Sequence, residues 1–584
     1  MIENIDYLFL NKLNDKQKSI CLSDDNFTLT ACPGSGKTRT ITYRLAYMAE
    51  KYKDSKKLNM AITYTNRAAE EIENRLINIG IDMSNVWTGT IHQFCMKFII
   101  RPYSMYLSRL SKGFRIIDEY EKEKYIKEIA SSVGFNNKHI NNLLNNPTIM
   151  KKYLNILEKN REIDFDMILQ YSLELVAKKH YIAENIGRII RCIHVDEYQD
   201  TNEKQYQILS CIVKTNLNIN ILFVGDINQA IYGSLGGVAK SPNEIRELFP
   251  IKFKEECLEG CYRSTQRIID YYSNFEVSTT GAISVADIAE KKGIIVLDQK
   301  THKTNLASTI ATIIKEQLET GIPENEICII APQWYQIFPM ANNLKKLLPD
   351  VNFDAPDISP IKYDPLNVFF LIAKLLFTQD SGHFEVRKKI ANEILSMFKM
   401  DFKISFSDNI DKFDLLKVIN STQFIYEDGI KTLINAIGNI YKLLNIDEDK
   451  ETSLKLGKNS FINKMRDRVK NYKLEYSCNA MKRCFKERKG VVVNTIHGVK
   501  GEEYTTVITF DLLKGHLPNW NTIINCTEQY CHDETCKLIY VACSRAKENL
   551  YLIAERGRVT KNSGQPLVTT PELANCSFKY DIIK

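Results

Sequence analysis

The sequence predicts an α/β fold with two parallel β-sheets, and three observations predict it. Short apolar runs typical of strands alternate with helical patterns in both halves of the chain. A glycine-rich string, ACPGSGKT at 31–38, lies between a strand-like run and a helical stretch. At 584 residues the chain is also too long for one hydrophobic core, so several domains or subdomains are expected.

The elements of the first sheet follow one another in chain order. The glycine-rich string is preceded by FTLT and followed by a helical stretch that begins RTITYRLAYMAE. Three further runs are predicted to be strands: MAITYT at 60–65, IIRCIHV at 189–195 and INILFVGD at 219–226. Polar motifs follow these runs, so we expect them at the C-terminal ends of the strands, where open α/β sheets bind ligands.

A second sheet is expected from the second half of the chain. Its predicted strands are GIIVLD from 293, EICIIAP from 326, GVVVNTI from 490, TVITFD from 506 and LYLIAE from 550. The most apolar run, VFFLIAKLLF at 368–377, is too short to cross a bilayer and contains a lysine, which favours a core helix.

Composition narrows the class of protein. Hydrophobic residues make up 44% of the chain and charged residues 26%, which is ordinary for a globular protein in water. The net charge of +7 permits a nucleic-acid partner without requiring one. The N-terminal MIENIDYLFL lacks the features of a signal peptide, and no stretch is long enough to span a membrane. We therefore expect a cytoplasmic protein with no membrane partner.

The glycine-rich string has the features of a phosphate-binding loop. Its glycines let backbone N–H groups wrap a phosphate chain at the start of a helix, while Lys37 would reach the terminal phosphates and Thr38 would bind Mg²⁺. The strict pattern begins with glycine, where this chain has the small residue Ala31. The residues assigned to nucleotide binding here are Ala31, Cys32, Pro33, Gly34, Ser35, Gly36, Lys37, Thr38 and Arg39.

The acidic string HVDEYQDTN at 194–202 would be costly without a nearby cation. Adjacent carboxylates at a buried strand end repel each other and lose their hydration. A bound nucleotide gives them separate tasks: Asp196 would hold Mg²⁺, and Glu197 would orient and deprotonate the water that attacks the γ-phosphate. His194, on the buried strand itself, is interpreted as structural.

With these strings in place, the chain resembles the UvrD/Rep/PcrA-like superfamily 1A helicases from Leu13 to about Leu550. The motifs that carry the resemblance, in the family's order, are LNDKQ at 13–17, ACPGSGKT at 31–38, NMAITYTNRAAEEIENRL at 59–76, TGTIHQFC at 88–95, DEYQDTN at 196–202, VGDINQAIYG at 224–233, LEGCYRST at 258–265, VNTIHGVKGEEYTTVI at 493–508 and LIYVACSRAK at 538–547. The resemblance implies two RecA-like P-loop lobes that use ATP and Mg²⁺.

The resemblance also implies which side chains contact the nucleotide. Gln17 would contact the adenine base, Tyr262 would stack on it, and Glu503 would contact the ribose. The residues implied in catalysis are Glu197, Lys37, Arg263, Arg545 and Gln229, with Arg263 at the γ-phosphate and Gln229 coupling phosphate state to DNA grip. An arginine such as Arg545, supplied across a cleft, stabilises transition-state charge and is withdrawn when the cleft opens.

For DNA, the resemblance implies stacking and polar contacts. Aromatic side chains that stack on bases are worth about 1–3 kcal/mol per base. The residues implied in DNA binding are Thr63, Tyr64, Asn66, His92, Tyr232, Thr495 and His497. Core packing is the alternative for Tyr64 and Tyr232. After VGDINQAIYG, Ser234 and Leu235 stand where the family has an aromatic residue and an arginine, which suggests weaker or differently stepped DNA binding.

Two divergent segments are expected to be mainly helical insertions, one in each lobe. The predicted division is 1–95 with 186–277 for the first lobe, 96–185 for its insertion, 278–379 with 486–584 for the second lobe, and 380–485 for a second, compact insertion. A compact second insertion leaves the strength of unwinding open.

Two functions from different classes remain. The first is an ATP-driven 3′→5′ translocase on single-stranded DNA that unwinds tailed duplexes, in DNA repair or anti-phage defence. The alternative is a nucleic-acid-gated ATPase that serves as sensor for a partner nuclease, since in outline the chain also resembles helicase-like subunits of anti-phage systems such as Gabija. The stretch after Ala546 is too short for a nuclease domain, so any cutting is expected from another chain.

Overall fold

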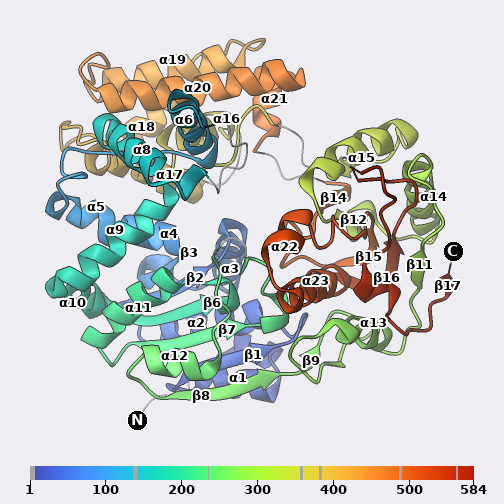
Figure 1. The fold of residues 1–584 in the computed structure, drawn as a ribbon. Helices are drawn as coiled ribbons and strands as arrows, with labels where there is room; N and C mark the ends of the chain where they lie inside the picture. Colours follow the sequence, from blue (N-terminus) through green and yellow to red (C-terminus); the bar gives the residue numbers. More distant parts are fainter. Residues whose placement is uncertain are drawn as a thin grey trace. The chain divides into compact units, whose positions relative to one another are not determined.

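The chain divides into two compact units, each described by itself. The computed structural model describes residues 7–135, 143–233, 236–355, 359–379, 384–485, 489–560 and 563–583. The first unit comprises Met1–Ile91, Glu184–Asp357 and Arg488–Lys584, and the second comprises His92–Ala183 and Ile358–Glu487. The first unit contains both large β-sheets, and the second is almost entirely helical (Figure 1).

The first sheet has six parallel strands in the order β3-β2-β6-β7-β1-β8. Its strands are β1 Asn26–Ala31, β2 Leu58–Thr63, β3 Val86–Thr90, β6 Ile190–Asp196, β7 Asn220–Gly225 and β8 Phe253–Leu258. The predicted inner strands are confirmed. The two edge strands were not predicted, because VWTGT and FKEECL lack the continuous apolar run of a strand that is buried on both faces.

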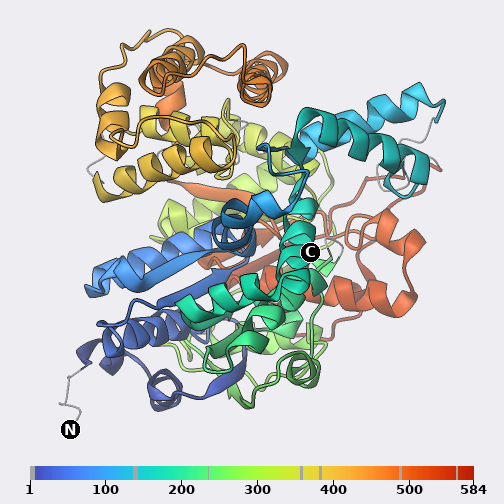
Figure 2. The same ribbon diagram turned by 90° about the vertical axis from the view of Figure 1, so that its left-hand side faces the viewer.

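Helices flank the strands of this sheet (Figure 2). The helices of this part of the chain are α1 Asp15–Leu22, α2 Lys37–Lys51, α3 Asn66–Ile79, α10 His180–Ile189, α11 Glu203–Thr215, α12 Pro242–Leu248 and α13 Gln266–Tyr272. The helix predicted after the glycine-rich string is confirmed as α2, and most of its residues are buried. On α11, the ring of Tyr206 packs against Phe223 of β7, with centroids 6.1 Å apart.

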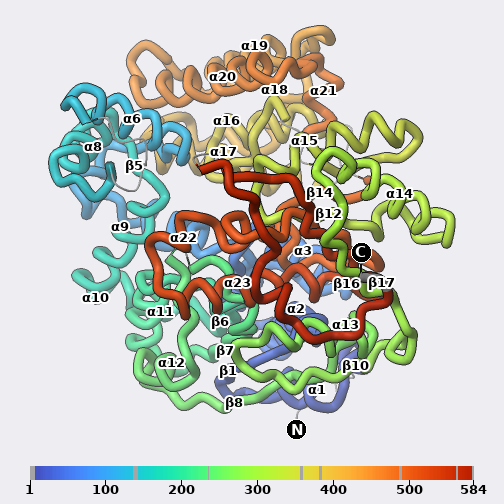
Figure 3. The backbone as a smooth tube through the Cα atoms, turned by 45° about the vertical axis from the view of Figure 1, so that its right-hand side comes forward, coloured from blue at the N-terminus to red at the C-terminus, as the bar shows by residue number. Residues whose placement is uncertain are grey.

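The second sheet has seven parallel strands in the order β13-β14-β12-β15-β16-β11-β17. Its strands are β11 Ile295–Asp298, β12 Ile327–Ala331, β13 Phe353–Asp354, β14 Val491–Thr495, β15 Tyr504–Thr509, β16 Ala546–Ile553 and β17 Ile582–Ile583. Figure 3 labels β16 and β17 near the end of the chain, in red, and β11 pairs with both of them. All five predicted strands are confirmed, and the two-residue edge strands were not predicted.

The helices and a small ribbon complete the first unit. The helices of this region are α14 Leu306–Glu319, α15 Trp334–Leu347, α22 Trp520–Asn525, α23 Glu528–Cys543 and α24 Pro571–Ala574, and the short strands β9 Gly260–Cys261 and β10 Ile283–Ser284 pair with each other. One continuous hydrophobic core contains Ile268 and Tyr272 of α13 together with Tyr540 of α23 and Ile330 of β12. The mixed α/β class with two parallel sheets, as in RecA-like lobes, is thus what the structure shows.

The second unit is built from helices and one two-stranded pair. Its elements are α4 Ile91–Phe94, α5 Arg101–Tyr103, β4 Arg115–Ile116, α6 Glu119–Ser132, α8 Pro147–Asn160, β5 Glu162–Ile163, α9 Phe165–Lys178, α16 Val368–Phe377, α17 Phe384–Met400, α18 Lys412–Asn420, α19 Gly429–Leu443, α20 Thr452–Tyr472 and α21 Cys478–Arg483. The predicted core helix at 368–377 is confirmed, since nearly every residue of α16 is buried. Within the described residues, no helix combines the length and apolar character needed to cross a bilayer.

Buried ion pairs join the two segments of the second unit. The guanidinium of Arg101 donates to both carboxylate oxygens of Asp401, at 2.8 and 3.0 Å, and also contacts Glu393. Glu121 accepts hydrogen bonds from Arg115 on its own segment and from Lys464 on the other. The segments that contain most of the two predicted insertions therefore fold against each other. The assignment of one insertion to each lobe stays a prediction.

Candidate functional site

The phosphate loop has a backbone that requires its glycines. Gly34 and Gly36 have φ of +73° and +82°, in the left-handed region that favours glycine. A Cβ on Gly34 would lie 2.6 Å from the Cβ of Arg263, so a larger residue cannot fit without movement. Inside the loop, the Ser35 hydroxyl donates to the carbonyl of Cys32 at 2.7 Å. The backbone is thus held in an open turn directly before the first residue of α2.

The side chain of Lys37 gives the most direct indication that the loop binds an anion. Its Nζ is buried, and within the described part of the chain it has no hydrogen-bond partner. The nearest opposite charge is Oε1 of Glu197, at 3.8 Å. A buried ammonium group without hydrogen bonds is costly, so the loop favours a ligand with several anionic oxygens. The terminal phosphates of a nucleotide have this chemistry.

Thr38 and Asp196 provide oxygen donors that suit Mg²⁺. The Thr38 hydroxyl donates to Oδ2 of Asp196 at 3.4 Å. Burial and the neighbouring carboxylate of Glu197 raise the pKa of Asp196 above its usual range, and Lys37 opposes them. A hydroxyl and a carboxylate beside a phosphate site are ligands of the kind that Mg²⁺ takes in such enzymes. The donor set therefore fits this ion.

Glu197 follows β6 in a left-handed backbone conformation, with φ of +51°. Its Oε2 accepts a hydrogen bond from the amide of Gln199, whose own Oε1 accepts from the backbone N–H of Asp226 at 3.0 Å. Burial alone would raise the pKa of Glu197, but the ammonium groups of Lys37 and Lys500 outweigh burial and hold it below the usual value. Glu197 is therefore an ionised, oriented carboxylate at the mouth of the phosphate loop.

Gln17 and Tyr262, the residues predicted to contact the adenine base, lie beside the phosphate loop. Gln17 is buried, and its amide donates to the carbonyl of Ser35 at 3.0 Å. The hydroxyl of Tyr262 accepts a hydrogen bond from Asn14 at 2.7 Å, which leaves its ring half-exposed. Arg39 donates to the carbonyl of Lys12. The structure thus brings Gln17 and Tyr262 to the same loop, and their contact with adenine stays a prediction.

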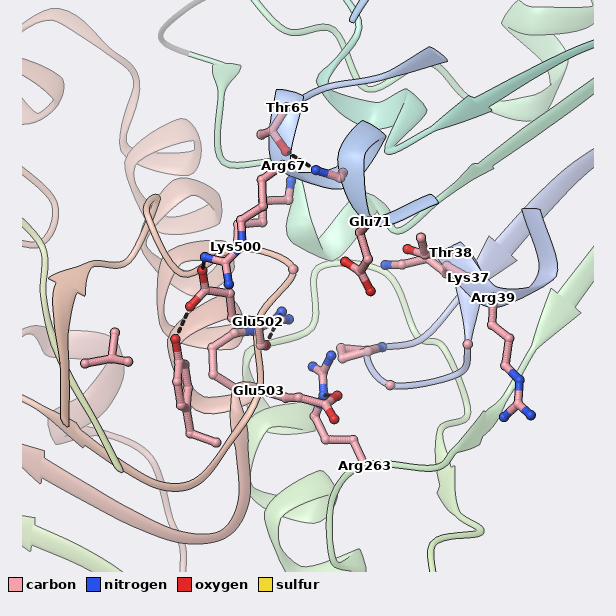
Figure 4. A pocket seen from close by; sticks show the side chains of 18 of the residues that line it. Lys37, Thr38, Arg39, Thr65, Arg67, Glu71, Arg263, Lys500, Glu502 and Glu503 are labelled. Atoms are coloured by element: carbon pink, nitrogen blue, oxygen red, sulfur yellow. Dashed lines mark hydrogen bonds and ion pairs between the residues drawn. The ribbon is translucent and has the colours of Figure 1, made fainter. Parts of the chain in front are cut away.

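Residues from the second sheet line the same cleft. Its volume is about 760 Å³, and both Lys37 and Arg545 line it. Figure 4 shows Lys37 and Thr38 on one side and Lys500, Glu502 and Glu503 on the other. Motifs from opposite ends of the chain therefore meet around one space.

Two arginines lie in this cleft close to each other. Arg545 is buried, and its guanidinium donates to Oε1 of Gln229 at 3.2 Å and to the carbonyl of Glu502 at 3.1 Å. Burial and the positive charge of Arg263 lower the pKa of Arg545 to about 9. Arg263 itself donates to Glu503 at 2.8 Å. Two neighbouring cations in a partly buried cleft repel each other, and a bound polyanion would offset this repulsion. The phosphate chain of a nucleotide is such a polyanion.

Sequence reasoning missed Lys500. From the loop after β14, its Nζ contacts the carboxylate of Asp200, donates to the carbonyl of Gln229 at 2.6 Å and lies 3.9 Å from Oε2 of Glu197. Burial raises the pKa of Asp200 to about 6 even beside this ammonium. The signal was present in the sequence, because three carboxylates in DEYQD need more positive charge than Lys37 alone supplies.

We expect Lys500→Met to slow ATP turnover and to shift its pH profile. Loss of an opposite charge within about 4–6 Å raises a carboxylate pKa by about 1–3 units, so the acidic limb of the profile should move to higher pH. Steady-state turnover measured between pH 5 and 9, in steps, checks this, with the exposed Lys315→Met on α14 as control. A Lys500→Met profile that superimposes on wild type would rule out an electrostatic role for Lys500.

Three of the predicted DNA-binding side chains pack together. The rings of Tyr64 and Tyr232 have centroids 4.4 Å apart, and that of His497 lies 5.3 Å from Tyr232. The Tyr232 hydroxyl donates to the carbonyl of His497 at 3.2 Å, and Lys500 Nζ lies 5.2 Å from the Tyr232 ring. We call Tyr64, Tyr232 and His497 the tyrosine–histidine cluster. Its members contact each other, so packing and DNA contact are compatible roles.

The other predicted DNA-binding residues are placed less simply. Thr495 ends β14 and accepts a hydrogen bond from the N–H of Gly498 at 3.1 Å. Thr63 is buried and donates to the carbonyl of Thr65 at 2.8 Å, while Asn66 is the first residue of α3. The polar groups of Thr63 and Thr495 are thus engaged within the protein.

His92 and His194 are the remaining histidines of the sequence motifs. His92 lies in the second unit with its ring 5.6 Å from that of Phe165, and burial lowers its pKa to about 4. His194 is fully buried, and burial places its pKa well below the usual value, which agrees with a structural role. Ser234 and Leu235 lie outside the described residues.

Known families match most of the chain. The model described as the UvrD/REP helicase N-terminal domain matches residues 13–147 and 137–250, and that of the UvrD-like helicase C-terminal domain matches residues 377–557. A relative from Staphylococcus epidermidis, "ATP-dependent DNA helicase PcrA", is 22% identical over 93% of this chain and 83% of its own length. The protein of the same name from Staphylococcus aureus is 24% identical over 94% of this chain and 84% of its own length.

A phosphate loop after β1 and an arginine just before β16, both lining one cleft, are features of a P-loop enzyme that hydrolyses nucleotides. The chain belongs to the UvrD/Rep-like helicases of superfamily 1A, and it is an ATP-dependent DNA helicase.

Proposed function

We propose that this protein is an ATP-driven translocase that moves 3′→5′ along single-stranded DNA and thereby unwinds tailed duplexes. The observation that carries the proposal is the cleft lined by Lys37, the first residue of α2 beside the first sheet, and by Arg545, which directly precedes β16 of the second sheet. A nucleotide bound there would be held from both sides, so its hydrolysis would change the relation between the sheets. The similarity to relatives named ATP-dependent DNA helicase supports DNA as the track.

Each side chain in the cleft has a separate role in ATP hydrolysis. Lys37 binds the terminal phosphates, and Glu197 orients the attacking water and accepts its proton. Thr38 and Asp196 would hold Mg²⁺, which neutralises charge on the phosphates when bound. Arg545 adds positive charge where negative charge develops in the transition state.

Gln229 connects the nucleotide cleft to the proposed DNA-contacting residues. Its Oε1 accepts from Arg545 at 3.2 Å, and its Nε2 donates to Oδ2 of Asp226 at 2.7 Å. Two residues further on, the carbonyl of Ile231 lies 3.2 Å from Nε2 of His497. A movement of Arg545 on hydrolysis would therefore reach the tyrosine–histidine cluster through one short segment. This is the physical basis of the proposed coupling.

The test measures ATP turnover with and without single-stranded DNA, then strand displacement from duplexes with 3′ or 5′ tails. We expect stimulation by DNA and displacement from the 3′ tail. Contacts to backbone phosphates release counterions, so the affinity for single-stranded DNA should fall steeply as salt is raised. Displacement from the 5′ tail alone would contradict the direction, and an affinity independent of salt would contradict phosphate contacts.

A second candidate is a nucleic-acid-gated ATPase that acts as sensor for a partner nuclease. One sequence feature favours it: Ser234 and Leu235 replace the aromatic residue and the arginine of the family pattern. In this case the same assays would show turnover stimulated by DNA without strand displacement. Co-purification of a nuclease with the tagged protein would then support this candidate, and failure to recover one would contradict it.

A further inference from the structure

Helix α15 begins with three exposed aromatic side chains. Trp334, Tyr335 and Phe338 are 53%, 59% and 38% exposed. Trp334 and Phe338 are four residues apart and thus lie on one side of the helix, while Ile337, with its neighbours, packs into the core. We call Trp334, Tyr335 and Phe338 the α15 aromatic face. The helix and the strand β12 that precedes it are labelled in Figure 1.

The start of α15 is held firmly, so these rings are not on a loose loop. The backbone N–H of Gln333 donates to Oε1 of Gln336 at 3.0 Å, which caps the helix. The amide of Gln333 also donates to the carbonyl of His516 at 3.4 Å, and the ring of His516 lies 2.8 Å from Oδ1 of the buried Asp511. Because the cap residues are fixed to the loop after β15, the aromatic face is presented by a rigid element.

The strand before the aromatic face pairs with the strand that ends in a residue predicted to contact DNA. In the second sheet, Ala331 at the end of β12 is paired in register with Thr495 at the end of β14, and the N–H of Ile496 donates to the carbonyl of Ala331 at 3.1 Å. Trp334 follows Ala331 by three residues. Two residues beyond Thr495 is His497 of the tyrosine–histidine cluster. The backbone pairing of β12 with β14 therefore connects the aromatic face to His497, and His497 packs against another predicted DNA-contacting ring.

We propose that the α15 aromatic face, of which Trp334 is the first residue, is a base-stacking platform for single-stranded DNA beside the second sheet. The proposal rests on the proposed function. Every base offers a flat surface to an aromatic ring, so stacking holds a strand without reading its sequence. Lys345 and Lys346 in the last turn of α15 place positive charge on the same helix, which suits a polyanion. The platform would supply stacking in a chain that has Ser234 where its family has an aromatic residue.

The test compares Trp334→Ala and Trp334→Phe with wild type in the binding of a fluorescent oligothymidine at fixed salt. We expect Trp334→Ala to bind about tenfold more weakly, and Trp334→Phe to bind within about twofold of wild type because it keeps a ring. Leu347→Ala, at the exposed far end of the same helix, is the matched control and should bind like wild type. Equal affinity of Trp334→Ala and wild type overturns the proposal.

A strand of the same length with abasic sites separates stacking from other effects. Without bases there is nothing to stack, so Trp334→Ala and wild type should bind the abasic strand equally. If Trp334→Ala weakens both strands alike, the face is not a stacking platform. If wild type neither binds the oligothymidine nor is stimulated by it, the proposed function fails by itself. A face used for a protein partner would leave every DNA affinity unchanged in the variants, which also overturns the proposal.

Discussion

Glu197→Gln should abolish nearly all ATP turnover while ATP and single-stranded DNA still bind. A positioned general base contributes about 10²- to 10⁴-fold to such a reaction, and the glutamine amide cannot accept the proton. The substitution keeps the size of the side chain, so the hydrogen bond partner Gln199 and the fold of the loop should be retained. Turnover by phosphate release and affinity for a fluorescent ATP analogue are the two measurements.

The control for this variant is Glu203→Gln, a half-exposed carboxylate on α11 that pairs with Lys240 at 2.8 Å. Like Glu197→Gln, this substitution removes one carboxylate charge near Glu197 in the sequence. The variant should hydrolyse ATP at the wild-type rate. Normal turnover by Glu197→Gln would remove Glu197 from the role of base. Loss of ATP binding in this variant would mean instead that the carboxylate supports the loop.

Arg545→Ala should lower turnover by about 10³- to 10⁵-fold, the range known for an arginine that stabilises phosphoryl-transfer charge. Arg545→Lys should also be impaired, because an ammonium group cannot replace the planar fork that reaches Gln229 and the carbonyl of Glu502 at once. Since Arg545 is buried, thermal unfolding of both variants has to be measured alongside kcat. The lysine variant keeps the charge and is the safer test of the two.

Arg556→Ala is the matched control, since Arg556 is an exposed arginine shortly after the end of β16 at Ile553, and its Nε donates to the carbonyl of Gln299. It should leave turnover unchanged. If folded Arg545→Ala hydrolyses ATP as fast as wild type, Arg545 does not complete the site, and full activity of Arg545→Lys alone would mean that the charge suffices without the planar fork. A fall in ATP affinity with unchanged kcat would make Arg545 a binding residue only.

The sequence predicted those parts of the fold that have a strong local pattern. Each inner strand of both sheets is rich in apolar and β-branched residues, because helices cover both faces, and each was predicted. The edge strand β8 contains three consecutive charged residues, and the edge strands β13 and β17 have only two residues each. Such strands are defined by their neighbours in the sheet, which no local pattern reveals.

At the candidate site, the chemistry of each single motif could be predicted from the sequence, but the contacts between distant motifs could not. The ACPGSGKT string indicated a phosphate loop because its backbone conformation depends on its own glycines. The role of Lys500 depends on Asp200, far away in the sequence, so only the folded chain brings them together. The same holds for Tyr64 and Tyr232, for which packing and DNA contact were both open and whose rings now prove to lie against each other. His92 shows the converse, since its motif gave no sign of the ring of Phe165 beside it.

The ion pairs of Arg101 have a consequence for attempts to recombine this chain with its relatives. A chimera that takes only the 358–487 segment from another helicase would leave Arg101 buried opposite a residue that was not selected to face it. Removing one partner of such a buried pair costs about 3–5 kcal/mol. The two segments of the second unit should therefore be exchanged together, as one module, even though they are separated in the gene.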